Sequence, residues 1–128
     1  MAITEIQAGR YTVRGRSLGG FYTGLHVPEL GALFDAGTAL RTGSAAKYLF
    51  ISHAHADHLG ALPGLLGMRG LTGIKTPLKV FAPEEIVTDV QNGLEAFSHM
   101  HRWSLDIEVC AMAPGMEVQL KGNLYVRA

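Results

Sequence analysis

A cluster of three histidines and one aspartate constrains this chain more than any other feature. His53, His55, Asp57 and His58 follow directly after the apolar run at residues 48–51. If that run is a buried strand, the backbone leaves the sheet still extended, and side chains two positions apart point the same way. His53 and His55 can then share one metal cation, whereas Asp57 and His58 lie where the chain turns towards a helix and offer ligands to another. The spacing therefore predicts two metal ions rather than one.

The alternative interpretation of this cluster is a set of polar loop residues without a common ligand. Loops often carry an isolated His or Asp, and for a single His this interpretation is the better one. Three imidazoles and a carboxylate have no packing reason to gather in one loop, so the pattern favours metal binding.

The residues around the cluster resemble the metal-binding signature of the metallo-β-lactamase superfamily, and within it the ribonuclease Z branch, the tRNA 3′-processing endonucleases. The H-x-H-x-D-H core at residues 53–58 is typical of the whole superfamily. The continuation GALPGLL at residues 60–66, with LGG at 18–20 and FDAG at 34–37, narrows the resemblance to that branch. The resemblance covers about residues 10–127.

The resemblance implies an α/β fold of layered α+β type, the αββα sandwich in which two sheets pack face to face between helices. Residues 1–128 would be the N-terminal portion of a single such domain, supplying about one sheet and its helices. In the family a third His follows a strand that resembles residues 124–127, and a bridging carboxylate and further His residues complete both metal sites. This chain stops at Ala128, so we expect an N-terminal half that is inactive by itself.

Composition sets wide limits on partners and location. The chain has 128 residues, of which 48% are apolar, so it forms one globular unit at most. The charges of eleven basic and eleven acidic residues cancel, so composition neither supports nor excludes an RNA partner. Cys110 is the single cysteine, and its alternating apolar surroundings predict a buried structural thiol in a reducing compartment. Without a secretory signal or an apolar run near ~18 residues, we expect a soluble cytoplasmic protein and no membrane partner.

Glycine and proline positions divide the chain into short strands and two helices. The first third predicts an antiparallel meander. Pro63 begins a helix over residues 63–69 that Gly70 ends. A second helix opens at Pro83, with an apolar face made of Ile86, Val90, Leu94 and Phe97. The predicted strands are residues 3–7, 11–16, 21–27, 32–35, 48–51, 78–82, 105–112, 116–120 and 124–126.

Four further polar residues have distinct interpretations. Asp35 ends an apolar strand and can accept a hydrogen bond from the outer nitrogen of a ligating His; capping of the next turn is the alternative, and the resemblance favours the first. His26 reads as a sheet residue rather than a ligand. His99 and His101 repeat the H-x-H spacing, but on a helix they lie about 200° apart around the axis and cannot chelate one ion.

Three classes of function follow from these residues and from the resemblance. The first, implied by the resemblance, is a phosphodiesterase that removes the 3′ trailer of precursor tRNA with water activated by two divalent cations, zinc or alternatively manganese. Asp57 is its expected catalytic residue, because a ligand beside that water can orient it and accept its proton. The second is another hydrolase of the same fold, acting on a small phosphodiester, lactone or sulfate ester. The third is a non-catalytic binding module or folding fragment.

The missing second sheet predicts how the chain associates. We expect the inner sheet face, lined by residues such as Leu49, Ile51 and Val80, to lack a covering partner. Exposed apolar area costs about 25 cal/mol per Å² and marks an interface. The chain is therefore expected to form a homodimer or to pair with a separate C-terminal half.

Overall fold

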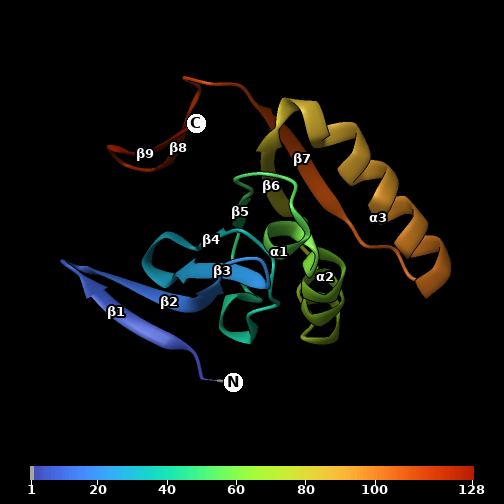
Figure 1. Cartoon of the computed structure of the whole chain (residues 1–128), viewed down its shortest axis with the longest axis horizontal. Helices are drawn as coiled ribbons and strands as arrows, with labels where there is room; N and C mark the ends of the chain where they lie inside the picture. Colours follow the sequence, from blue (N-terminus) through green and yellow to red (C-terminus); the bar gives the residue numbers. More distant parts are fainter. Residues whose placement is uncertain (1) are drawn as a thin grey trace.

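The main sheet joins seven strands in the order in which they occur along the chain. The structure is a computed structural model that describes residues 2–128, and in it β1 to β7 form this sheet while β8 and β9 form a separate hairpin (Figure 1). The strands are β1 Thr4–Ala8, β2 Tyr11–Leu18, β3 Tyr22–Val27, β4 Ala32–Phe34, β5 Tyr48–Phe50, β6 Leu78–Pro83, β7 Ile107–Met112, β8 Glu117–Lys121 and β9 Leu124–Arg127. The helices are α1 Ala56–Leu59, α2 Leu62–Leu71 and α3 Val87–His101, with 3-10 turns η1 Pro28–Leu30, η2 Arg41–Gly43 and η3 Glu84–Ile86.

The direction of the strands changes halfway across the sheet. Strands β1 to β4 pair antiparallel, as the glycine turns predict, and β4 to β7 pair parallel. Parallel neighbours need long crossover connections, which α1 with α2 supplies between β5 and β6, and α3 between β6 and β7. Each predicted strand is present, with bounds that differ by up to two residues.

One face of the sheet is covered by α2 and α3. Leu49 and Val80 are fully buried there, and Ile51 joins them in a core with side chains of both helices. The expectation that these three residues line an uncovered face is therefore wrong. Alternation along a strand assigns side chains to two faces, but it does not tell which face the following helices will cover.

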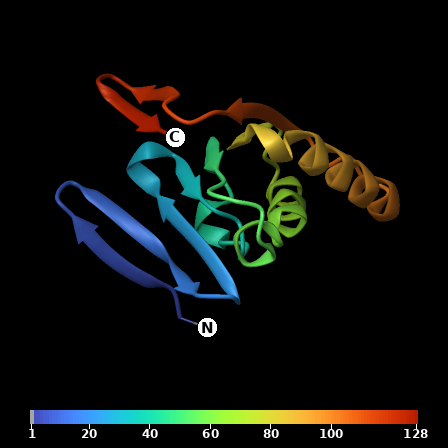
Figure 2. The same ribbon diagram turned by 45° about the horizontal axis from the view of Figure 1, so that its top comes forward.

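The opposite face carries a row of aromatic rings across the parallel strands. Phe34, Phe50 and Phe81 occupy matching positions on β4, β5 and β6, and neighbouring rings stack with centroids 5.4 and 4.8 Å apart. The β8–β9 hairpin packs Val118, Leu120 and Val126 against this cluster. Figure 2 shows the hairpin beyond the end of β7 and away from α2. A cavity of about 470 Å³ lies beside this contact, lined by Phe50, Phe81 and Val126.

Cys110 packs against the same aromatic cluster. It is half-buried rather than buried, which corrects the expectation from its apolar neighbours. Cys110 lies on β7, the last strand in the order of the sheet, so it has a strand neighbour on one side only.

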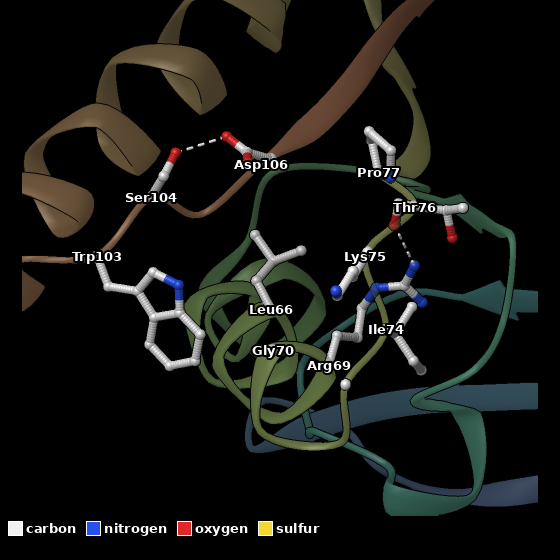
Figure 3. A pocket seen from close by; sticks show the side chains of 11 residues that line it. Leu66, Arg69, Gly70, Ile74, Lys75, Thr76, Pro77, Trp103, Ser104 and Asp106 are labelled. Carbon is white, nitrogen blue, oxygen red and sulfur yellow. Dashed lines mark hydrogen bonds between the residues drawn. The ribbon is translucent and has the colours of Figure 1, made fainter.

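Two helix predictions also need correction. Helix α2 runs through Gly70 to Leu71, so Gly70 does not end it. The ring of Trp103 lies against this glycine (Figure 3), and a Cβ there would lie 2.4 Å from Trp103 Cζ2. On α3, Val90 and Leu94 are buried as expected, but Phe97 is 47% exposed, so the apolar face ends one turn early. No helix in residues 2–128 combines the length and apolarity needed to cross a bilayer.

Replacing Gly70 with Ala is expected to displace the Trp103 ring from α2. The added methyl group overlaps the ring, and overpacking of this kind costs about 1–3 kcal/mol. Gly67→Ala, on the same helix, is the matched control: no atom lies within 4 Å of its added Cβ, so it should stabilise the helix by about 0.5–1 kcal/mol. Trp103 is the single tryptophan, and its emission without denaturant should be shifted to the red in Gly70→Ala only. Denaturant titration should give a lower free energy of unfolding for Gly70→Ala only. Identical emission and stability in both variants would contradict this packing.

Candidate metal centre

The histidine cluster occupies the loop after β5 and the first turn of α1. His55 keeps extended dihedral angles (φ −64°, ψ 145°) and immediately precedes α1, on which Asp57 and His58 lie. The rings of His53 and His55 have centroids 4.7 Å apart, and those of His53 and His58 4.1 Å apart. The three imidazoles therefore gather in one place, with His53 nearer to His58 than to His55.

The proximity of the three imidazole rings does not by itself make a coordination sphere. Within residues 2–128, no three His, Cys, Asp or Glu side chains have the arrangement needed to hold a metal ion. The ring contacts concern the planes of the side chains, whereas coordination requires their nitrogen and oxygen atoms to point at one position. Metal ligation by His53, His55, Asp57 and His58 stays a prediction.

Asp35 organises one side of the cluster. Its carboxylate accepts hydrogen bonds from the backbone N–H of Ser52 at 2.7 Å and from the Ser52 hydroxyl at 2.8 Å. His58 Nδ1 lies 2.8 Å from Asp35 Oδ2. An ionised carboxylate only accepts hydrogen bonds, so Nδ1 carries the hydrogen of this contact, and in the neutral imidazole His58 Nε2 then keeps its lone pair. That Nε2 atom lies 3.3 Å from Asp57 Oδ2, so an imidazole and a carboxylate face each other beside the loop.

The backbone of Asp35 is strained in a way that this network can support. Its φ of 62° is in the left-handed region, which costs a non-glycine residue about 1–2 kcal/mol. The carboxyl group is largely buried, and three hydrogen bonds hold it in place. Such strain persists where surrounding contacts determine the conformation, which is common at functional sites.

The segment that follows Asp35 packs directly on α1. The N–H of Ala36 donates to the carbonyl oxygen of His58 at 2.7 Å, and the N–H of Ala61 donates to that of Ala36 at 2.8 Å. A Cβ at Gly37 would lie 1.6 Å from the carbonyl oxygen of Asp57, so only glycine fits. The FDAG segment at residues 34–37 and the histidine cluster are thus one structural unit.

These residues suit a divalent transition metal in their chemistry. Imidazole nitrogens and a carboxylate are ligands that zinc and manganese accept. A ligating His commonly donates its outer N–H to a carboxylate, which fixes its orientation and raises its basicity, and the Asp35 to His58 hydrogen bond has that form. The donor set therefore fits the predicted metals.

Two further contacts at this site were not predicted. Ser52 holds Asp35, and its hydroxyl also lies 3.0 Å from His53 Nδ1. The N–H of Gly20, in the β2–β3 turn, donates to Asp57 Oδ2 at 3.0 Å. Ser52 could have been suspected from its place between the strand and the first His. Gly20 belongs to the LGG segment that contributes to the resemblance, but nothing local links it to a residue so far along the chain.

The remaining histidines lie elsewhere in the fold. His26 is in β3, opposite Arg14 and Leu33, which agrees with its reading as a sheet residue. Burial, and next the charge of Arg14, lower the pKa of His26, with Glu29 acting in the opposite direction. His99 and His101 are exposed at the end of α3. His101 stacks on Trp103 with ring centroids 5.6 Å apart.

Comparison with known proteins gives sequence relatives but no family model that matches. The chain is 37% identical over 122 residues to the chloroplastic tRNase Z TRZ2 of Arabidopsis thaliana, an alignment that covers 95% of this chain and 34% of the relative. It is 35% identical over 118 residues to the nuclear ribonuclease Z of Triticum aestivum, covering 92% of this chain and 66% of the relative. The chain thus spans between about one third and two thirds of the length of these two curated relatives.

A solved structure has the same fold. The crystal structure of the metallo-beta-lactamase fold protein YhfI from Bacillus subtilis matches with a TM-score of 0.51, covering 85% of this chain and 41% of that one. The two sequences are 15% identical, so this likeness concerns the fold alone. The layered α/β architecture of this chain is that of the metallo-β-lactamase fold.

Proposed function

We propose, because this chain belongs to the ribonuclease Z branch of the metallo-β-lactamase superfamily, that it supplies part of a metal centre that removes the 3′ trailer from precursor tRNA. One observation carries the proposal. Asp35 binds His58 at Nδ1 and leaves Nε2 facing the Asp57 carboxylate, which is the arrangement of a ligand pair with its supporting carboxylate. The tRNase Z and ribonuclease Z names of the two relatives support the choice of substrate.

Each residue of the proposed centre has a defined task. His53 and His55 would hold one cation, and Asp57 with His58 the other. The two cations, zinc or alternatively manganese, would supply an activated water and charge stabilisation at the phosphodiester. Asp35 holds His58 in one tautomer, and Asp57 orients the attacking water and accepts its proton. Because Gly20 N–H occupies Asp57 Oδ2, the second oxygen of that carboxylate is the proposed proton acceptor.

Activity is proposed for an assembled protein rather than for these residues alone. Four ligating side chains divided between two cations leave each ion short of protein ligands, which lowers affinity. Either a second copy of the chain or a separate C-terminal half would complete the centre. A cytoplasmic location is proposed from the sequence, although one relative is named chloroplastic.

A second candidate is supported by the charge balance. Eleven basic and eleven acidic residues give no excess of positive charge, whereas proteins that bind nucleic acid usually carry one. The same centre acting on a small phosphodiester, lactone or sulfate ester needs no such excess.

The two candidates are separated by offering the assembled protein both kinds of substrate in Zn²⁺ or Mn²⁺. We expect cleavage of precursor tRNA on the 3′ side of the discriminator nucleotide, leaving a 3′-hydroxyl. Asp57→Asn should slow it by about 10²–10⁴-fold through loss of the proton acceptor. Hydrolysis of bis(p-nitrophenyl) phosphate without cleavage of precursor tRNA would instead support the small-ester hydrolase.

A further inference from the structure

The turn between β2 and β3 reaches the proposed catalytic carboxylate. The turn is closed by a hydrogen bond from Phe21 N–H to Leu18 carbonyl oxygen, 2.9 Å long. Gly20 has a φ of 79°, which glycine adopts without strain. In this conformation its N–H donates to Asp57 Oδ2 at 3.0 Å. A residue far away in the sequence thus orients the carboxylate on α1.

A second contact fixes the same hairpin against the metal loop. Gly37 N–H donates to the carbonyl oxygen of Thr23, at the start of β3, with a distance of 2.8 Å. Gly37 itself lies against the backbone of Asp57, where a Cβ would approach the carbonyl oxygen to 1.6 Å. Two contacts therefore hold the turn next to Asp57: the hydrogen bond of Gly20, and the packing of Gly37 between Thr23 and Asp57.

The side chains on either side of this contact are apolar and exposed. Phe21 is 73% exposed and Leu18 is 51% exposed. In the part of the chain that the structure describes, neither side chain belongs to the two core clusters. Packing within the chain thus gives no reason for an aromatic ring at this position. Consecutive Cα atoms are about 3.8 Å apart, so the ring of Phe21 begins one residue from the amide that binds Asp57.

We propose that the ring of Phe21 is a stacking platform for a base of single-stranded RNA next to the phosphate that Asp57 serves. This inference rests on the proposed function and names how the same site positions its substrate. Exposed aromatic rings bind unstacked bases of single strands whatever the base sequence, because every base has a π face. The 3′ trailer is such a strand, and the Gly20 contact fixes the backbone next to Phe21 relative to the Asp57 carboxylate.

The chain loaded with Zn²⁺ and titrated into a fluorescently labelled single-stranded RNA oligonucleotide tests this platform by anisotropy. Phe21→Leu keeps an apolar side chain but removes the π face, and stacking is worth about 1–3 kcal/mol per base. We expect affinity to fall by about 5- to 150-fold, the equivalent of that range. Phe97→Leu, at an aromatic residue 47% exposed on α3, should leave affinity unchanged. Phe21→Trp should retain it.

Abasic nucleotides identify the stacked base. Moving one abasic position along the oligonucleotide should reveal a single place where the wild type loses affinity and Phe21→Leu loses nothing further. If the wild type binds RNA and Phe21→Leu binds equally well, the stacking inference is wrong and the proposed function stands. If the Zn²⁺-loaded wild type shows no affinity for RNA, the stacking inference is wrong, and cleavage of precursor tRNA by the assembled protein decides the proposed function separately. A change in self-association instead of RNA affinity would make Phe21 a protein contact and overturn the inference.

Discussion

Replacing His53 and His55 together with Ala is expected to remove one of the two metal ions proposed for the chain. The two rings lie 4.7 Å apart on the extended loop after β5, and both would coordinate the same cation. Loss of two direct ligands should lower the affinity for that ion by more than the roughly 10–100-fold that follows loss of a supporting hydrogen bond. Elemental analysis after dialysis against Zn²⁺, and competition with a chelator, give the number of ions and their affinity.

The chain contains its own matched control for this experiment. His99 and His101 have the same H-x-H spacing, but they are exposed on α3, where residues two apart diverge by about 200°. Replacing both with Ala removes the same atoms and should leave the metal content unchanged. Equal metal content in the wild type and in the His53, His55 double variant would eliminate the proposed site.

The parts of the site that the sequence predicts are those set by local geometry. His53 and His55 gather because an extended chain repeats every two residues, and Asp35 is recognisable because it ends an apolar strand. Gly20 and Ser52 are different. Their contacts with Asp57 and Asp35 depend on how the β2–β3 turn and the loop after β5 pack, and no periodicity of the sequence encodes such a meeting.

The fold shows the same division between local and tertiary information. Strand positions follow from glycine turns and apolar runs, and all nine predicted strands are found within residues 2–128. The face of the sheet on which Leu49 and Val80 lie is decided by the paths of α2 and α3. Glycine is typical of helix ends, yet Gly70 lies within α2 and leaves room for the ring of Trp103. In both cases the deciding contact comes from a distant part of the chain.

The second large effect expected is association of the chain with a second copy or with another chain. The interface would contain the row of Phe34, Phe50 and Phe81 and the β8–β9 hairpin. A two-stranded hairpin is at best marginally stable in water without further strands or a covering layer. In the described residues, β8 and β9 pair only with each other, and a cavity of about 470 Å³ lies beside their contact with the sheet, lined by Phe50, Phe81 and Val126. A second copy, or a C-terminal half, can extend the hairpin, fill this cavity and cover Tyr125, which is 50% exposed on β9. Sheet edges and exposed apolar area both favour association.

Light scattering coupled to size-exclusion chromatography should therefore give a mass above the 13.7 kDa of one chain, increasing with protein concentration. Hydrogen exchange locates the interface: amides of β8 and β9 should become more protected as concentration rises, because pairing supplies partners for their edges. Amides of α3, whose protection depends on bonds within the helix, serve as the internal reference and should not change. A monodisperse 13.7 kDa monomer that melts cooperatively would show that the hairpin and the aromatic row close a sufficient core by themselves.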